Sequence, residues 1–186
     1  VSFESHSSAI WLQRVRTGER RRLLARPGIN GSPAFEPTRG DRLAVTLSTV
    51  GGNLDIYVVA LADGALTRVT SDPAIDTEAV FSPDGRWIAF VSKRGEDKES
   101  QIYVIPTDGG EARRVTNVPT GASVPKWFPD SQRIAFVSEI WIDLVNWDDQ
   151  AKRRQEREDS KMSGKLWSKA PVSYWDHYLD DREAHV

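Results

Sequence analysis

The sequence predicts an all-β fold, a partial β-propeller of about three four-stranded blades with a helical insertion near the C-terminus. The first observation is a 46-residue repeat, marked by Pro37, Pro83 and Pro129. The second is the similarity of the surrounding segments, FEPTRGDRLAVTLS, FSPDGRWIAFVS and WFPDSQRIAFVS. The third is that each unit alternates short apolar runs with turns. A period of about 40–50 residues with four short strands is typical of propeller blades.

The unit at residues 74–119 shows how each element is expected to form. Pro83 presets φ for a tight turn, and Gly85 supplies a positive φ, so the chain reverses direction between the first two strands. The second strand, WIAFV, is almost continuously apolar, which predicts burial on both faces. Arginine and threonine in the fourth strand suit an outer edge. The four strands are expected at residues 79–81, 87–91, 101–105 and 113–116.

The repeats are expected to occupy residues 1–138, and a helix-containing blade insertion and tail residues 139–186. The repeats divide into a half blade at 1–27, blades at 28–73 and 74–119, and a half blade at 120–138. These strands are too few for a closed ring of four to eight blades. We therefore expect either self-association through open blade faces, with a homodimer completing a six-bladed ring, or a fragment of a longer chain. The start at Val1 leads us to expect a processed, excised or engineered piece.

The segment WDDQAKRRQEREDSKMS predicts a helix because helix formers dominate it. Asn146 or Asp148 could cap its start, and the pairs Asp148–Lys152 and Asp149–Arg153 have favourable i,i+4 spacing. The helix has no apolar stripe, which favours a solvated or bridging helix over a docking surface for acidic partners. The last residues of the chain are expected to begin the missing third strand of the interrupted blade.

Composition argues against several classes of function. The formal net charge of −2 provides no basic field for nucleic acid, and no apolar run approaches the ~20 residues of a membrane span. The chain has no cysteine, which excludes disulfides, thiolate metal sites and cysteine nucleophiles. It also lacks a Gly-x-Ser-x-Gly elbow and a phosphate-binding loop. We expect no enzyme activity, no catalytic residues and no cofactor.

The segment WDHYLDD contains the residues that most resemble a chemical site. His177 with Asp176, Asp180 and Asp181 offers nitrogen and oxygen ligands for a weakly bound metal. However, adjacent residues of a strand point to opposite faces, so Asp176 and His177 would diverge. The alternative is an anchor in which the aromatic residues are buried and the polar groups bond to nearby backbone. The sequence favours the anchor, and we assign no metal site.

The first half of the chain contains the segments NGSPAF, IYVVALADGALTRVT and DPAIDTEAVFSPDGR. Because of these segments, the first half of the chain, about residues 1–85, resembles TolB, the periplasmic propeller of the Tol–Pal system. The resemblance implies a six-bladed parent ring and a periplasmic location for this half. It also aligns Thr77 and Glu78 with a Thr-Glu pair at the channel mouth, where the peptidoglycan-associated lipoprotein docks.

The second half contains DGGEARRVTNVPTGASVPKWFPDSQRIAFVS, QAKRRQEREDSK and PVSYWDHYLDD. Residues 86–186 resemble the N-terminal propeller of prolyl oligopeptidase-family serine peptidases, in the acylaminoacyl-peptidase-like branch. That resemblance implies a helical blade insertion and is compatible with the cytoplasm, so the compartment stays undecided. A change of family near Phe81–Ile88 suggests a chimera of two propellers.

The expected binding site is the channel mouth, which the innermost strands and their entry loops surround. We expect a protein or peptide ligand there and a non-catalytic role as a self-assembly and protein-binding scaffold. The alternative function is the substrate-gating propeller portion of a serine peptidase that lacks its catalytic domain here. An alternative role for Asp76 and Thr77 is only to hold the turn between blades. The candidate partner-binding residues are Asn30, Ser32, Asp76, Thr77, Glu78 and Ser123.

Overall fold

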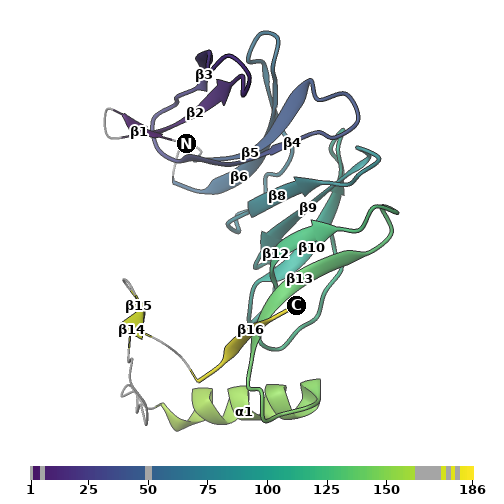
Figure 1. The fold of residues 1–186 in the computed structure, drawn as a ribbon. Coiled ribbons are helices and arrows are strands. Elements are labelled where there is room, and N and C mark those ends of the chain that lie inside the picture. The colour runs from purple at the N-terminus through teal and green to yellow at the C-terminus, as the bar shows by residue number, and fades with distance from the viewer. Residues whose placement is uncertain (1, 5–6, 49–51, 162–172, 175–176, 179–180) are drawn as a thin grey trace.

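The computed structural model describes residues 2–4, 7–48, 52–161, 173–174, 177–178 and 181–186. Four antiparallel sheets follow one another along the chain and are arranged in an arc, with one helix at its C-terminal end (Figure 1). The arc does not close. The predicted all-β, partial-propeller architecture is therefore confirmed.

Each sheet is a meander of short strands in chain order. The first contains β1 (Ser2–Glu4), β2 (Ser7–Gln13) and β3 (Arg20–Leu24). The second contains β4 (Asn30–Phe35), β5 (Arg42–Ser48), β6 (Leu54–Ala60) and β7 (Leu66–Arg68). The third contains β8 (Thr77–Phe81), β9 (Trp87–Ser92), β10 (Gln101–Pro106) and β11 (Arg113–Arg114). The fourth contains β12 (Ser123–Trp127), β13 (Ile134–Ile140) and β16 (Glu183–His185), and β14 (Ser173–Tyr174) with β15 (His177–Tyr178) forms a separate hairpin.

The apolar core lies between consecutive sheets, and the second strand of each complete sheet contributes to it on both faces. On β9, Ile88 and Phe90 pack toward the second sheet, whereas Ala89 and Val91 pack toward the fourth. All four side chains are buried. A continuous apolar run is needed for this arrangement because alternate residues of a strand face opposite sides.

The fourth sheet is completed by a strand from the far end of the chain. β16 pairs antiparallel with β13, with Glu139 opposite Ala184, and so takes the third position in this sheet. The expectation that the last residues begin the third strand is confirmed. The connection between β13 and β16 contains helix α1 (Trp147–Ser160).

Helix α1 begins at the cap Asn146, whose side chain accepts a hydrogen bond from the backbone N–H of Asp149 at 2.9 Å. The predicted pair Asp149–Arg153 is wrong. The Asp149 carboxylate accepts instead from the Asn146 amide at 2.8 Å, and Arg153 forms a bidentate pair with Asp143 at 2.8 and 2.9 Å. Two parallel hydrogen bonds match guanidinium to carboxylate better than one contact along a helix.

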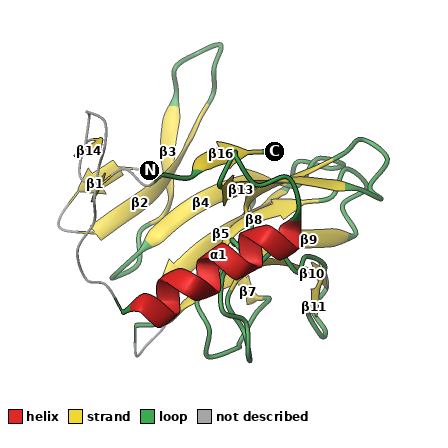
Figure 2. Cartoon of the chain, turned by 90° about the horizontal axis from the view of Figure 1, so that it is seen from below, coloured by secondary structure: helices red, strands yellow, loops and turns green. Residues whose placement is uncertain are grey.

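The helix is tied to the rest of the fold through buried side chains at its base. Gln150 is 2% exposed. Its amide oxygen accepts a hydrogen bond from the backbone N–H of Trp141 at 3.0 Å, and its amide nitrogen donates to the carbonyl of the same residue at 2.8 Å. The indole of Trp141 lies beneath three guanidinium groups, at 5.7, 5.0 and 5.6 Å from those of Arg153, Arg157 and Arg182. Since Arg182 directly precedes β16, one indole links the helix to the added strand. Figure 2 looks onto the outer side of α1.

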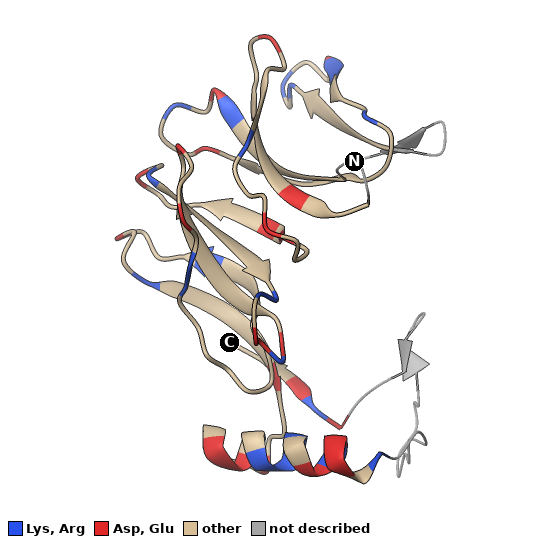
Figure 3. Cartoon of the chain, turned by 180° about the vertical axis from the view of Figure 1, so that it is seen from behind, with Lys and Arg blue, Asp and Glu red and all other residues tan. Residues whose placement is uncertain are grey.

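Charged residues of both signs are interspersed along α1, whereas β9 and β10 contain none (Figure 3). The mixture provides no single-sign field for an acidic or basic partner. Among the described residues, no helix combines the length and the apolar character that crossing a membrane requires.

Glu36, in the turn between β4 and β5, is a buried carboxylate held by its own turn. Burial acts to raise its pKa. The Thr38 hydroxyl and the backbone N–H groups of Arg39, Thr38 and Gly40 act against burial and lower the pKa to about 2. The side chain is 1% exposed, so solvent screens these hydrogen bonds little.

We expect Glu36→Gln to reduce the acid sensitivity of the fold. A lowered folded-state pKa gives stability that is fully present above about pH 4.5 and is lost as the pH falls toward 2. Between pH 5 and pH 2.5 the wild type should lose about 2–3 kcal/mol more unfolding free energy than the variant. Urea denaturation at both pH values measures this difference, and equal losses in the two proteins would contradict it.

Candidate functional site

The inner strands carry a strained residue at the same place in each of three sheets. Ser32, Glu78 and Val124 are separated by 46 residues and have φ values of 49°, 55° and 50°. The inner strand shifts register at each place, between Gly31 and Ala34 in the first case. Positive φ is uncommon for residues other than glycine and is an outlier for a β-branched residue such as valine. The innermost strands therefore share a β-bulge that re-aims one side chain per blade.

The bulges of the third and fourth sheets are linked directly. The Glu78 carboxylate accepts a hydrogen bond from the backbone N–H of Val124 at 2.6 Å. Ser123, beside it, donates its hydroxyl to the carbonyl of Val137 at 3.3 Å. Thr77, Glu78 and Ser123 are half-buried, and Val124 is 46% exposed. We call Ser32, Thr77, Glu78, Ser123 and Val124 the inner rim.

Asn30, the first residue of β4, is fully buried. Its backbone N–H donates to the Ser8 hydroxyl at 2.6 Å, and its side-chain amide donates to the carbonyls of Ser8 and Arg26 at 2.8 and 2.7 Å. These bonds join the entry of β4 to the preceding sheet. The geometry gives Asn30 an anchoring contact between blades, whatever else the site binds.

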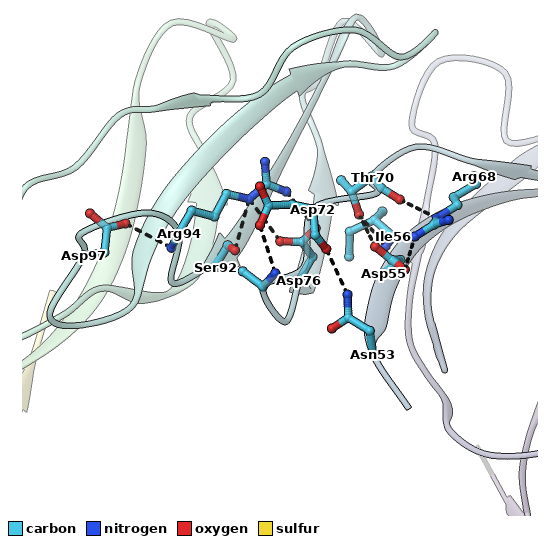
Figure 4. A network of polar contacts seen from close by, with 11 residues as sticks. Asn53, Asp55, Ile56, Arg68, Thr70, Asp72, Asp76, Ser92, Arg94 and Asp97 are labelled. Carbon is cyan, nitrogen blue, oxygen red and sulfur yellow. Dashed lines mark hydrogen bonds and ion pairs between the residues drawn. The ribbon is translucent and has the colours of Figure 1, made fainter. Parts of the chain in front are cut away.

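Asp76 occupies the equivalent place one repeat later, and its side chain is also fully buried. Its backbone N–H donates to the carbonyl of Leu54 at 2.9 Å. Its carboxylate accepts from Arg94 Nη2 at 2.7 Å and from Nε at 3.3 Å (Figure 4). The Arg94 guanidinium also lies over the rings of Phe90 and Tyr103, at 5.0 and 5.2 Å.

Neighbouring carboxylates in the same region are also paired. Burial raises the pKa of Asp55 despite the opposing effect of Arg68, whose Nη2 donates to it at 2.8 Å. Burial and a hydrogen bond to Asp97 raise the pKa of Tyr103 to about 12. The contacts of Asp55 with Arg68 and of Tyr103 with Asp97 each lie within one blade, so these groups have a structural role there.

The six candidate residues therefore divide into two groups. Asn30 and Asp76 are buried anchors, whereas Ser32, Thr77, Glu78 and Ser123 lie at the inner rim. Sequence reasoning missed Val124, although its 46-residue spacing from Glu78 was available as a signal. It also missed Arg94, because no motif surrounds it and only the fold brings it to Asp76.

The described residues contain no group of three or more histidine, aspartate and glutamate side chains that could hold a metal. Of the proposed ligand set in WDHYLDD, Asp176 and Asp180 lie outside the described residues. His177 is described only as part of the backbone of β15. The metal and anchor interpretations of this segment both stay predictions.

Consecutive meander sheets with innermost edges on one side define the chain as part of a β-propeller. The family model described as TolB beta propeller domain matches residues 1–168. The chain belongs to this family. The match extends across the junction predicted at Phe81–Ile88, so the change of ancestry there stays a prediction.

Individual relatives agree with this assignment. The chain is 35% identical over 94 residues to a protein TolB homolog of Chlorobium chlorochromatii, covering 50% of this chain and 20% of that protein. The structure of TolB from Acinetobacter baumannii aligns with a TM-score of 0.66 and 36% identity, over 73% of this chain and 33% of TolB. The chain thus spans about a fifth to a third of the length of these relatives.

The resemblance of the second half to a peptidase propeller has a structural counterpart. The acylaminoacyl peptidase of Pyrococcus horikoshii aligns over 82% of this chain and 21% of the peptidase, with a TM-score of 0.52. The identity is 18%, so this likeness concerns the fold alone.

Proposed function

We propose that the chain is a non-catalytic propeller scaffold whose inner rim binds an extended segment of a protein partner. The observation that carries the proposal is the recurrence of left-handed, non-glycine backbone at Ser32, Glu78 and Val124. Such conformations cost about 1–3 kcal/mol each and concentrate at ligand-binding positions. A shared binding surface explains the same strained backbone conformation in three sheets better than packing of the side chains does.

The chemistry of the rim suits a polypeptide. Glu78 already accepts a main-chain N–H, that of Val124, so the same carboxylate can accept an N–H from an extended ligand. Hydroxyl groups of Ser32, Thr77 and Ser123 add donors and acceptors, and the exposed part of Val124 adds apolar contact. The TolB resemblance suggests the peptidoglycan-associated lipoprotein as the first partner to test.

We expect Glu78→Gln to weaken binding of the soluble domain of that lipoprotein about tenfold, because a charged acceptor is replaced by a neutral one. Glutamine can still accept the Val124 N–H, so the rim should keep its shape. Isothermal titration calorimetry measures the effect. The matched control is Glu156→Gln on the exposed face of α1, which should bind as the wild type does. Equal affinity of the Glu78 variant, or no wild-type binding, would reject the proposal.

A second function, the gating propeller of a serine peptidase, is favoured by one observation. Helix α1 contacts the loop between β9 and β10 of the third sheet through its side chains. Arg154 pairs with Glu99 at 2.8 Å, and Lys98 donates to Gln155 at 3.0 Å. A helix held against a blade in this way suits a propeller that supports a further domain. Serine-dependent hydrolysis by this chain alone would contradict both functions as stated.

A further inference from the structure

A groove of about 470 Å³ lies between the second and third sheets, and none of the inner-rim residues lines it. It is lined by the connection after β7, residues 69–73, and by the turn before β11, residues 110–112. Ile105 of β10 and Arg94 of the loop after β9 complete the lining. Both flanking sheets have all four strands in this chain, so the groove involves neither end of it. Its volume is in the range of small-molecule pockets, about 300–1,000 Å³.

Two side chains along the groove are smaller than their equivalents one blade earlier. Between the first and second sheets, Leu23 and Leu66 pack against the core of that junction. The residues 46 positions later are Val69 and Ala112, in the core between the second and third sheets. Their shorter side chains leave space that leucine fills at the preceding junction. Together with Ile105, they give the groove an apolar floor.

Arg94 gives the groove a guanidinium group with unused donors. Its Nε donates to Asp76 and Ser92, and its Nη2 donates to Asp76 (Figure 4). Within the described part of the chain, Nη1 donates to no residue. The ion pair with Asp76 and the ring of Phe90, 5.0 Å away, hold the guanidinium in place. A fixed guanidinium with free N–H groups is a suitable donor to a carboxylate.

Asp72 and Glu111 bring carboxylates to the same groove from its two lining segments. One oxygen of Asp72 accepts the backbone N–H of Ala74 at 2.9 Å, and the other accepts from no described residue. Neither acid forms an ion pair with any residue that the structure describes. Because Asp76 already balances the charge of Arg94, the two carboxylates give the groove a negative net charge. They are acceptors for an ammonium group.

We propose that this groove binds a free α-amino acid with an apolar side chain, such as leucine. The carboxylate of the ligand accepts hydrogen bonds from Arg94 Nη1. Its ammonium group donates to Asp72, and Glu111 adds negative charge nearby. Its side chain lies on the floor formed by Val69 and Ala112. A zwitterion fits better than a simple ion, because an anion alone meets two unpaired acids and a cation alone leaves Nη1 unbonded. The inference does not depend on what the inner rim binds.

Isothermal titration calorimetry with three ligands tests the charges that the groove requires. We expect L-leucine to bind at millimolar or lower concentration. N-acetylleucine lacks the ammonium group and leucinamide lacks the carboxylate, so each should bind about tenfold more weakly or worse. Amide NMR shifts should locate leucine at residues 69–73 and 110–112. Absence of leucine binding, equal affinity for the three ligands, or shifts confined to other residues would overturn the proposal.

Ala112→Leu tests the apolar floor, because it introduces the residue present at the equivalent position Leu66. The larger side chain should fill the groove and abolish leucine binding while the fold is kept, which circular dichroism verifies. The matched control is Ala65→Leu, which adds the same side chain at an exposed turn and should bind leucine as the wild type does. Undiminished binding by the folded Ala112 variant would contradict the proposed site.

Asp72→Asn tests the ammonium contact separately from the shape of the groove. Asparagine can still accept the Ala74 N–H, so the connection after β7 should keep its conformation. We expect the affinity for L-leucine to fall about tenfold, because a charged acceptor becomes neutral. The affinity for N-acetylleucine, which has no ammonium group, should not fall. An equal loss for both ligands would show that Asp72 does not hold the ammonium group.

Discussion

Asp76→Ala is expected to lower the free energy of unfolding by about 3 kcal/mol, because it leaves the largely buried Arg94 guanidinium without its carboxylate. The Asp76 side chain is fully buried and that of Arg94 is 15% exposed. Water therefore cannot replace the two hydrogen bonds that the carboxylate accepts. Urea denaturation at pH 7 measures the change.

The control for Asp76 is an ion pair of the same residue types on the surface. Arg39 and Asp41 approach to 3.8 Å with side chains 64% and 57% exposed. Asp41→Ala should change stability by less than about 0.5 kcal/mol. A double variant, Asp76→Ala with Arg94→Met, should recover part of the loss because it also removes the unpaired charge. Similar losses for Asp76→Ala and Asp41→Ala would show that burial does not govern this pair.

The repeat made most of the fold predictable, because the strand order of one well-marked unit applies to every unit of the repeat. The turn at Pro83 and Gly85, the apolar strand after it and the helix cap at Asn146 are determined by local residues. The outer strand is shorter than expected and ends at Arg114. Here the Thr116 hydroxyl, rather than a strand residue, accepts the Ile102 backbone N–H at 2.9 Å.

The candidate site was less predictable, because its features depend on contacts between sheets. Spacing alone identified Asn30 and Asp76 as entries to inner strands, but only the fold shows that both are buried. The positive φ of Val124 has no local signal, since valine rarely adopts it. Similarly, Phe35 and Phe81 are equivalent in sequence, and the neighbouring sheet alone decides which one is buried.

Gly85→Ala is expected to destabilise the fold by about 3 kcal/mol or more, through two separate effects. Gly85 has φ +71°, which an L-residue adopts at a cost of about 1–2 kcal/mol. A Cβ at this position would also overlap the carboxylate of Glu36, in the corresponding turn of the preceding sheet. That carboxylate is fixed by hydrogen bonds to its own turn, so it cannot move aside without losing them. Thermal and urea denaturation measure the loss.

Two further variants separate the backbone effect from the overlap with Glu36. Gly18→Ala has the same φ of +71° with nothing within 4 Å of the new Cβ, so it should cost only the backbone part, about 1–2 kcal/mol. In a Glu36→Ser background, Gly85→Ala should cost only the backbone part, because serine is the residue at the equivalent position Ser82 and is short enough to clear the methyl group. If Gly85→Ala and Gly18→Ala lost equal stability, close packing between these turns would not contribute. If Gly85→Ala cost as much in the Glu36→Ser background as in the wild type, the overlap would lie elsewhere. The expected difference between the two glycines thus measures how tightly adjacent blades are packed at their turns.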